Sequence, residues 1–269
     1  MQLPIGVFDS GVGGLTVLRA LRAALPGEQF VYLGDTARLP YGTKSGETVT
    51  RYAEQAARVL VARGIKLLVV ACNTASAVGL GHLAAVFAPL PVIGVIEPGA
   101  EAACAASASG QIAVIATEGT VRGGAYERAI RARRPDATVI SAPCQLFVAL
   151  AEEGWVRGAI AEAIARRYLE GLVAEHPALD CLVLGCTHFP VLREAIAAAV
   201  GPRVALVDSA ETTARAVAGC LARTGLRAPA GAAGGAKFLA TDAPARFARV
   251  GAVFLGEAIA PEGVELVDL

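Results

Sequence analysis

Short apolar runs alternate along the chain with longer stretches in which apolar residues recur at helical spacing. This alternation is typical of βα units that build a mainly parallel sheet. We predict strands over residues 5–8, 30–33, 67–71, 92–96, 112–116, 138–140, 182–184 and 204–207. An α/β fold with parallel strands follows from this pattern.

Two of the helical stretches carry one clear apolar face each. Apolar residues three or four positions apart lie on the same side of a helix, so we expect both faces to pack on a core. The predicted core-facing residues are Leu15, Leu18, Leu21 and Leu25 in the first stretch, and Ile160, Ile164, Tyr168 and Leu172 in the second.

The predicted strands form a weak internal repeat, because four strands before residue 100 match four after residue 110 in order and approximate spacing. In the first set, strand 67–71 runs into Cys72, and in the second set, residues 182–185 run into Cys186. Ligands of parallel sheets bind outside the carboxyl ends of the strands. We therefore expect two facing halves that each present one cysteine to a shared cleft.

The chain beyond the second set of strands is too short for a further domain. Residues 227–236 are rich in Ala, Gly and Pro, which predicts a flexible surface loop. The remaining tail carries residues 237–241, a short helix, and apolar ends at 253–255 and 264–269. We expect this tail to pack on one of the two halves.

Composition narrows the choice of partners. The 24 basic and 24 acidic residues give a net charge of zero, with no basic stripe for nucleic acid or anionic lipid, so a small-molecule partner is favoured. Charged residues interrupt every apolar run before the roughly 20 residues that a membrane span needs. The N-terminal residues lack a secretory signal pattern, which predicts a cytoplasmic protein whose six cysteines are reduced thiols.

Two opposed cysteines suit the inversion of an amino acid at its α-carbon. Inversion removes a proton from one face and returns a proton to the other, so one acid/base group is needed on each side. A thiol with a pKa of about 8.5 serves in both roles near neutral pH. Buried cysteines are more often simple core residues. We interpret Cys104, Cys144, Cys181 and Cys220 in that way, and exempt Cys72 and Cys186 because they share one context in the two halves.

The segment Asp9-Ser10-Gly11-Val12-Gly13-Gly14 also follows a strand and opens a helix. Its glycines allow backbone amides to approach an anionic group at the helix N-terminus. The segment has neither the spacing of a dinucleotide fingerprint nor the lysine of a P-loop. Asp9 either relays a proton or pairs with a substrate ammonium, or it simply caps the helix.

Polar residues flank both cysteines. Asn73, Thr74 and Thr187 offer short hydrogen-bond donors for a carboxylate ligand, with helix capping as the alternative for the two threonines. His188 lies two residues after Cys186 and is placed to tune its protonation. We assign His82 and His176 to the surface. Since no further Cys or His lies at a ligand spacing from Cys186 and His188, we predict no metal site.

Several blocks, taken together, resemble the glutamate racemases of the aspartate/glutamate racemase family. The matching blocks are residues 6–18 (GVFDSGVGGLTVL), 32–42 (YLGDTARLPYG), 71–76 (ACNTAS) and 184–192 (LGCTHFPVL), with weaker matches at 114–117 (VIAT) and 207–209 (VDS). They follow the family's order over residues 6–209. As a set they are highly specific.

The resemblance implies a cofactor-independent, cytoplasmic enzyme that interconverts L- and D-glutamate, supplies D-glutamate for peptidoglycan, and forms a homodimer. It implies Cys72 and Cys186 as the catalytic acid/base pair, with Asp9 and His188 as their assistants. The implied substrate contacts are Asp9, Ser10, Tyr41, Gly42, Asn73, Thr74, Thr117, Thr187 and His188.

The resemblance further implies two similar, Rossmann-like parallel-sheet domains related by pseudo-twofold symmetry, with the site between them. The first comprises residues 1–97 and 209–269, and the second residues 98–208. The chain departs from the family at Ala116, where glycine is usual before the residue equivalent to Thr117. It departs again around Glu152, where the family carries an auxiliary acid, so either Glu152 or Glu153 matches that acid.

Three other functions are compatible with the residues. The same chemistry acting on aspartate or another amino acid is the nearest alternative, because one methylene separates the two substrates. A hydrolase or transferase with a nucleophilic cysteine activated by His188 leaves the second cysteine unexplained. A binding protein without catalysis would keep its affinity for glutamate when both cysteines become serine.

Overall fold

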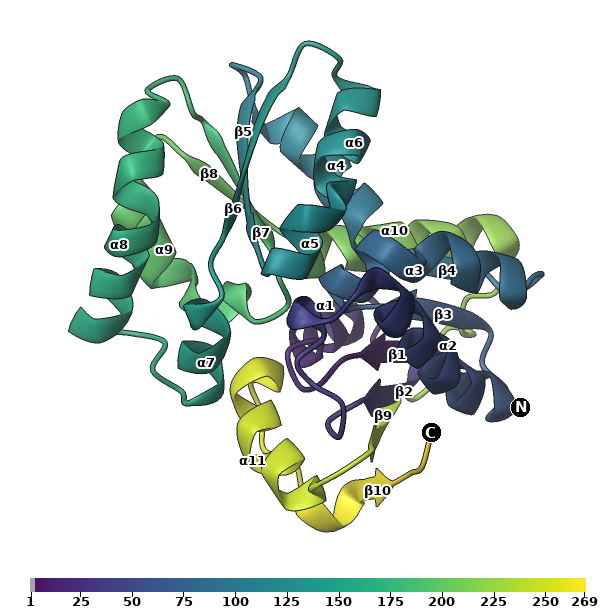
Figure 1. The fold of residues 1–269 in the computed structure, drawn as a ribbon. Helices are drawn as coiled ribbons and strands as arrows, with labels where there is room; N and C mark the ends of the chain where they lie inside the picture. Colours follow the sequence, from purple (N-terminus) through teal and green to yellow (C-terminus); the bar gives the residue numbers. More distant parts are fainter. Residues whose placement is uncertain (1–2) are drawn as a thin grey trace.

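The computed structural model describes residues 3–269 and divides them between two parallel β-sheets with helices around each (Figure 1). The first sheet has the strand order β10-β9-β2-β1-β3-β4. Its strands are β1 (Ile5–Asp9), β2 (Gln29–Gly34), β3 (Leu67–Val70), β4 (Val92–Gly94), β9 (Gly235–Ala240) and β10 (Val264–Leu266). The second sheet has the order β6-β5-β7-β8. Its strands are β5 (Gln111–Ala116), β6 (Thr138–Pro143), β7 (Cys181–Gly185) and β8 (Ala205–Asp208).

Helices connect successive strands, as parallel pairing requires. The α-helices are α1 (Leu15–Ala24), α2 (Gly46–Ala62), α3 (Asn73–Val86), α4 (Ile96–Ala106), α5 (Glu118–Gly123), α6 (Ala125–Arg133), α7 (Leu146–Glu152), α8 (Ala159–Glu175), α9 (Arg193–Val200), α10 (Ser209–Thr224) and α11 (Pro244–Leu255). Short 3₁₀ turns lie at η1 (Tyr41–Thr43), η2 (Phe189–Leu192) and η3 (Pro261–Gly263).

The internal repeat that the sequence indicated is present in the sheets. Within the first sheet, the order β2-β1-β3-β4 has the same pattern as β6-β5-β7-β8 in the second. In each half the first strand pairs in parallel with the second and third, and the third pairs with the fourth. All eight predicted strands are therefore confirmed in place and order. Their shared order puts the carboxyl ends of β3 and β7 in equivalent positions.

The two halves share an apolar core. One cluster of buried residues includes Ile5 of β1 and Leu67 of β3 together with Ala113 of β5 and Leu182 of β7. Helix α10, which follows the second sheet, contributes to the same cluster and contacts α1 and α4. Such a continuous core fixes the angle at which the strand ends of the two halves face each other.

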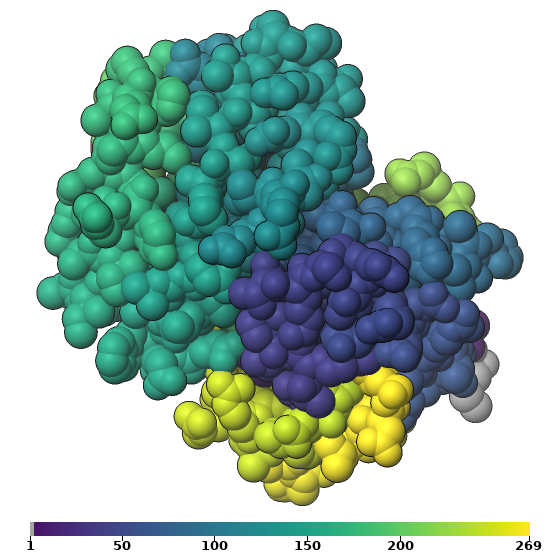
Figure 2. Space-filling model, in the orientation of Figure 1, coloured from purple at the N-terminus to yellow at the C-terminus, as the bar shows by residue number. Residues whose placement is uncertain are grey.

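The C-terminal segment returns to the first sheet. Strand β9 pairs in parallel with β2, and β10 pairs with β9, so the tail adds two strands at one edge. Helix α11 lies between these strands in the chain and contacts both α1 and α7 (Figure 1). In the space-filling view, the yellow-green and yellow surface of this segment meets the green surface of the second half (Figure 2). The tail thus packs on one half and also contacts the other.

Three sequence-based boundaries are wrong in detail. The fourth strand ends at Gly94 rather than at residue 96, because Val95 is the N-cap of α4 and Ile96 begins that helix. The loop predicted over 227–236 is shorter, since Gly235 already pairs with Gln29 in the sheet. Residues 253–255 are the last turn of α11 rather than a separate apolar end.

The predicted core face of the helix near residue 160 is confirmed for Ile164, Tyr168 and Leu172, which pack against the core, and is wrong for Ile160. Ile160 is 55% exposed, whereas Ala161, Ala165 and Leu169 are buried. Gly158, with φ of +84°, is the N-cap of α8, and Ile160 lies in the first helical turn beyond it. The face predicted from the first helix is confirmed, because Leu15, Leu18, Leu21 and Leu25 are all buried.

The predicted domain division stays a prediction. Its first boundary, between residues 97 and 98, lies inside α4, a helix that contacts α6 and β7 of the second half. Its second boundary, between residues 208 and 209, coincides with the junction of β8 and α10.

Candidate active site

A pocket lies between the two halves, at the carboxyl ends of the central strands. It contains about 490 Å³ of space not filled by protein atoms, including its opening to solvent. The predicted site residues that line it are Ser10, Tyr41, Gly42, Cys72, Asn73, Thr74, Thr117, Cys186, Thr187 and His188. The remaining predicted residue, Asp9, is fully buried at the end of β1. Sequence reasoning thus selected residues that the fold brings together.

The Cys72 side of the pocket is built by β1, β3 and α3. Cys72 is the N-cap of α3, where its sulfur accepts a hydrogen bond from the Ala75 amide at 3.5 Å. The Cys72 Sγ and Ser10 Oγ atoms are also 3.5 Å apart in a hydrogen bond. Donors of this kind favour the charged form of an acid/base group. They hold the sulfur at the helix start and facing the pocket.

Burial outweighs these donors at Cys72. Removal from water raises the pKa of the Cys72 thiol to about 12, and the nearby Asp9 carboxylate acts in the same direction. Burial also raises the pKa of Asp9, although the charge of His188 and three backbone amides oppose that shift. Cys72 is therefore a thiol at neutral pH, with a buried carboxyl group close by.

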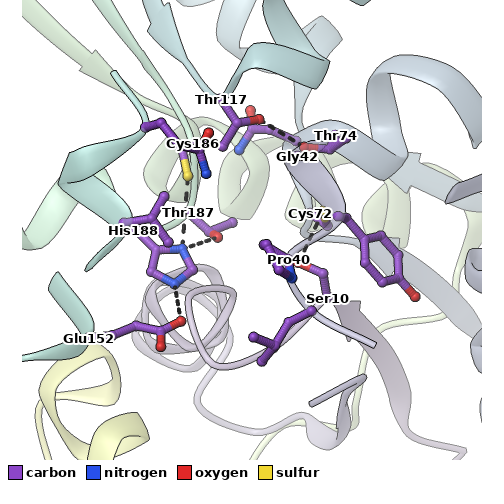
Figure 3. Close-up of a pocket in the computed structure, with 16 residues that line it drawn as sticks. Ser10, Pro40, Gly42, Cys72, Thr74, Thr117, Glu152, Cys186, Thr187 and His188 are labelled. Carbon is purple, nitrogen blue, oxygen red and sulfur yellow. Dashed lines mark hydrogen bonds and ion pairs between the residues drawn. The ribbon is translucent and has the colours of Figure 1, made fainter. Parts of the chain in front are cut away.

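The Cys186 side has a different set of neighbours (Figure 3). Cys186 follows β7 directly, and its sulfur lies 3.8 Å from Nδ1 of His188. The other ring nitrogen of His188 lies 3.3 Å from Oε1 of Glu152, the last residue of α7. Figure 3 shows Cys186, His188 and Glu152 in a row on one side of the pocket, with Cys72 and Ser10 on the other.

These neighbours keep His188 positively charged. Burial lowers the pKa of His188, but hydrogen bonds to Cys186 and Glu152 outweigh burial and raise the pKa to about 10. The hydrogen bond from His188, aided by Arg246, lowers the pKa of Glu152 to about 2 despite partial burial. An imidazolium therefore faces the Cys186 sulfur at neutral pH.

A group of hydroxyl and amide side chains from both halves is hydrogen-bonded beside the pocket. The Oγ1 atoms of Thr74, Thr117 and Thr120 lie 3.1 to 3.2 Å apart from one another. Tyr126 donates a hydrogen bond of 2.8 Å to Oδ1 of Asn73, which fixes the orientation of its amide. The Nδ2 atom of Asn73 is buried and has no hydrogen-bond partner among the described residues. An unpaired donor at the N-terminus of α3 is suited to bind a carboxylate.

Residues 39–42, at the end of the block 32–42, line the pocket. Tyr41 is buried and donates its hydroxyl hydrogen bond to Asp35, so the tyrosine ring is held in place. Gly42 packs so closely on Thr117 that an added Cβ would lie 2.7 Å from the Cβ of that threonine. Gly42 therefore allows close contact between the two halves beside the pocket.

A second glycine holds the Cys186 side against α1. A Cβ at Gly13 would lie 2.4 Å from both Nδ1 of His188 and Oγ1 of Thr187. Thr16, the second residue of α1, donates a hydrogen bond of 3.1 Å to the backbone oxygen of Thr187. The residues around Cys186 are thus held by the first half of the molecule as well as by the second.

Pocket residues that sequence reasoning missed come mostly from loops. They are Gly11, Leu39, Pro40, Gln145 and Val148. The first three lie inside or beside recognised blocks, so their signal was present. Val148 belongs to the segment around Glu152 that departs from the family pattern, Gln145 lies just before that segment, and nothing local in the sequence indicated either residue. Glu152 and not Glu153 contacts His188, while Glu153 is exposed at the end of α7.

The other histidines and cysteines lie outside the pocket. His82 is exposed and pairs with Glu54 on α2. Within residues 3–269, no cluster of three or more His, Cys, Asp or Glu side chains is arranged to hold a metal ion. None of the helices in this range is long and apolar enough to cross a membrane. What the pocket offers is two sulfurs, an imidazolium, a buried carboxyl group and several donors for an anionic ligand.

Comparison with known proteins agrees with this geometry. A family model described as Asp/Glu/Hydantoin racemase matches residues 5–217. A glutamate racemase of Geobacter metallireducens is 54% identical over 252 residues, which cover 94% of this chain and 92% of that protein.

Solved structures of similar proteins share the whole fold. The crystal structure of glutamate racemase from Francisella tularensis in complex with D-glutamate has a TM-score of 0.91 and 36% identity, covering 99% of this chain and 98% of that chain. The glutamate racemase of Thermus thermophilus in complex with β-chloro-D-alanine has a TM-score of 0.89 and 44% identity, covering 100% and 98%. The predicted fold class, two parallel-sheet α/β domains, is confirmed.

Proposed function

Because this chain belongs to the Asp/Glu/hydantoin racemase family, we propose that it interconverts L-glutamate and D-glutamate by proton transfer at the α-carbon. As a member of that family it is an isomerase. The observation that carries the proposal is the pairing of Cys72 and Cys186, which line one pocket from equivalent strand ends of the two halves. Glutamate is the substrate named for the similar proteins from Geobacter, Francisella and Thermus.

The neighbours of the cysteines support a division of labour. His188 as an imidazolium favours a thiolate at Cys186, whereas burial and Asp9 keep Cys72 as a thiol. In one direction the Cys186 thiolate takes the α-proton, and the Cys72 thiol gives a proton to the opposite face of the carbanion. The reverse reaction uses the same groups in exchanged roles, with the thiolate now at Cys72. No electron acceptor enters this scheme, so it runs without a cofactor.

The polar groups around the cysteines suit an amino acid. We assign the unpaired amide nitrogen of Asn73, with the hydroxyls of Thr74 and Thr117, to a substrate carboxylate. Such contacts stabilise the extra negative charge that develops when the α-proton leaves. Ser10 and Thr187 line the pocket near the two sulfurs, and Tyr41 and Gly42 also line it. Asp9 is assigned to assist Cys72 in moving its proton.

The remaining parts of the proposal follow from the family resemblance. The D-glutamate product would serve peptidoglycan synthesis, and the protein would act in the cytoplasm as a homodimer. The division into residues 1–97 with 209–269 and residues 98–208 belongs with these proposals.

The decisive experiment follows the loss of the circular dichroism signal of L- or D-glutamate, with no added cofactor. We expect the native protein to racemise both, and Cys72→Ser and Cys186→Ser to lose at least about 10³-fold in turnover, because each removes one acid/base group. Cys104→Ser and Cys220→Ser are matched controls outside the pocket and are expected to keep native activity. In deuterium oxide, the product should carry deuterium at the α-carbon.

The outcomes separate the alternatives. An unchanged circular dichroism signal with native protein, or full activity in either pocket variant, would contradict the proposal. Faster racemisation of aspartate than of glutamate would assign aspartate as the substrate and leave the proposed mechanism unchanged. Hydrolysis that depends on one cysteine alone would favour the nucleophile alternative, and glutamate binding without turnover would favour a binding protein.

A further inference from the structure

Glu152 is held from a part of the molecule that lies outside the second half. Its Oε2 atom accepts a hydrogen bond of 2.7 Å from Nη2 of Arg246, while Oε1 faces His188 at 3.3 Å. Arg246 belongs to α11, which returns from the first sheet, whereas Glu152 belongs to α7 of the second half. A continuous series of contacts therefore runs from Arg246 through Glu152 and His188 to Cys186.

The position of Glu152 on its own helix does not hold its side chain in place. It is the last residue of a seven-residue helix, where the partial negative charge of the helix end disfavours a carboxylate. Across residues 3–269, the ion-pair partners of Glu152 are His188 and Arg246. A guanidinium that engages one carboxylate oxygen leaves the other directed at the imidazole.

A second residue of α11 contacts the same imidazole. The ring of Phe254 packs edge-on against His188, with ring centroids 5.0 Å apart and an angle of 74° between the planes. Phe254 is fully buried, whereas the Arg246 side chain is 44% exposed. Helix α11 thus contacts the histidine directly through Phe254 and indirectly through Arg246.

We propose that Arg246 is a positioning residue of the racemase site, which holds Glu152 against His188 across the boundary between the two halves. This inference rests on the proposed function, in which His188 serves Cys186. Arg246 lines no part of the pocket and contacts no reacting atom, so its effect passes through Glu152. Loss of Arg246 should then slow turnover more than it weakens substrate binding.

The test compares Arg246→Met, which keeps the apolar stem, with Arg249→Met on the same helix as a matched control. Arg249 is exposed and does not line the pocket. We expect Arg246→Met to lower kcat about 10-fold with KM changed less than about 3-fold. Without Arg246, Glu152 no longer holds His188 beside the acid/base group Cys186. Arg246→Lys should recover part of the loss, and Arg249→Met should match the native protein.

Titration of His188 by NMR gives a readout that does not depend on turnover. The titratable groups that face His188 are Cys186, Glu152 and Asp9, with Arg246 beyond Glu152. Removing a cation alone would raise the pKa of His188. Displacement of the Glu152 carboxylate should instead lower that pKa from about 10, because the hydrogen bond that His188 donates to Glu152 is lost. We expect the downward shift in Arg246→Met and no shift in Arg249→Met.

A double variant completes the test. If Arg246 acts through Glu152, adding Arg246→Met to Glu152→Gln should cost little beyond Glu152→Gln alone. Equal losses in both backgrounds, an unchanged or raised His188 pKa, or native turnover in Arg246→Met would each overturn the inference. Absence of racemisation in the native protein would instead overturn the proposed function, and the titration would still report on Arg246.

Discussion

The two cysteines occupy equivalent places in a repeated fold and yet have opposite surroundings. Cys72 lies beside a serine hydroxyl and near a fully buried carboxyl group, and burial raises its pKa to about 12. Cys186 lies beside an imidazole whose pKa is raised to about 10 by its hydrogen bonds to Cys186 itself and to Glu152. The repeat places the two sulfurs at equivalent strand ends, and neighbours that are not repeated give each sulfur a different charged environment. A symmetric pair of backbones thereby supports an asymmetric pair of acid/base groups.

The largest expected effect comes from removing the imidazole. His188→Asn should lower turnover about 10²-fold or more, because Cys186 loses the neighbouring imidazolium that assists its proton transfer. The Cys72 side remains intact, so the enantiomer that faces Cys72 should still exchange its α-proton with deuterium oxide without inversion. Proton NMR measures that exchange for each enantiomer. His82→Asn is the control, and equal exchange of both enantiomers would contradict a separate role for each half.

Asp9→Asn makes the same comparison from the other side. We expect a loss of about 10-fold in turnover, with the exchange preference reversed to the opposite enantiomer. The pKa of Cys72 should fall because the Asp9 carboxylate contributes to raising it, while burial keeps it above the usual range. Alkylation of Cys72 followed by mass spectrometry over a pH series measures this. An unchanged alkylation profile would show that Asp9 does not affect the pKa of the Cys72 thiol.

The smallest expected effect is on stability rather than turnover. The pKa of His188 is raised from 6.5 to about 10, so its contribution to stability is fully present below about pH 6.5 and is lost as the pH rises through about 10. The difference in unfolding free energy between native protein and His188→Asn should therefore shrink by about 1–3 kcal/mol over this range. For Cys72 the corresponding loss lies between about pH 9 and pH 12. Urea titrations at each pH check both windows, and a difference that grows with pH would contradict the charge assigned to His188.

The contrast between the two sides also explains what the sequence could predict. Strand ends, the repeat and the short motifs are local patterns, and they located Cys72, Cys186 and their immediate neighbours. The contacts of Glu152 with Arg246 and of His188 with Phe254 join residues far apart in the chain, and no local pattern marks such pairs. The Cys72 side was therefore predicted almost completely, and the Cys186 side in part.

The errors in the predicted helices and strands also arise because local patterns do not show tertiary packing. Ile160 has the right spacing for a core residue, but Gly158 sets the start of its helix, and packing chose the face that holds Ala161. The fourth strand looked longer because apolar residues continue through Ile96, and apolar character alone does not distinguish a strand from the first turn of a buried helix.

The return of α11 to the first sheet has a consequence for the order in which the protein is made. Residues 244–255 leave the ribosome after both cysteines and both sheets' central strands have been synthesised. Under the proposed function, a nascent chain already holds its two acid/base groups but lacks the contacts that hold the His188 side in place. Turnover at the native rate would thus wait until α11 has been synthesised and has packed against α1 and α7.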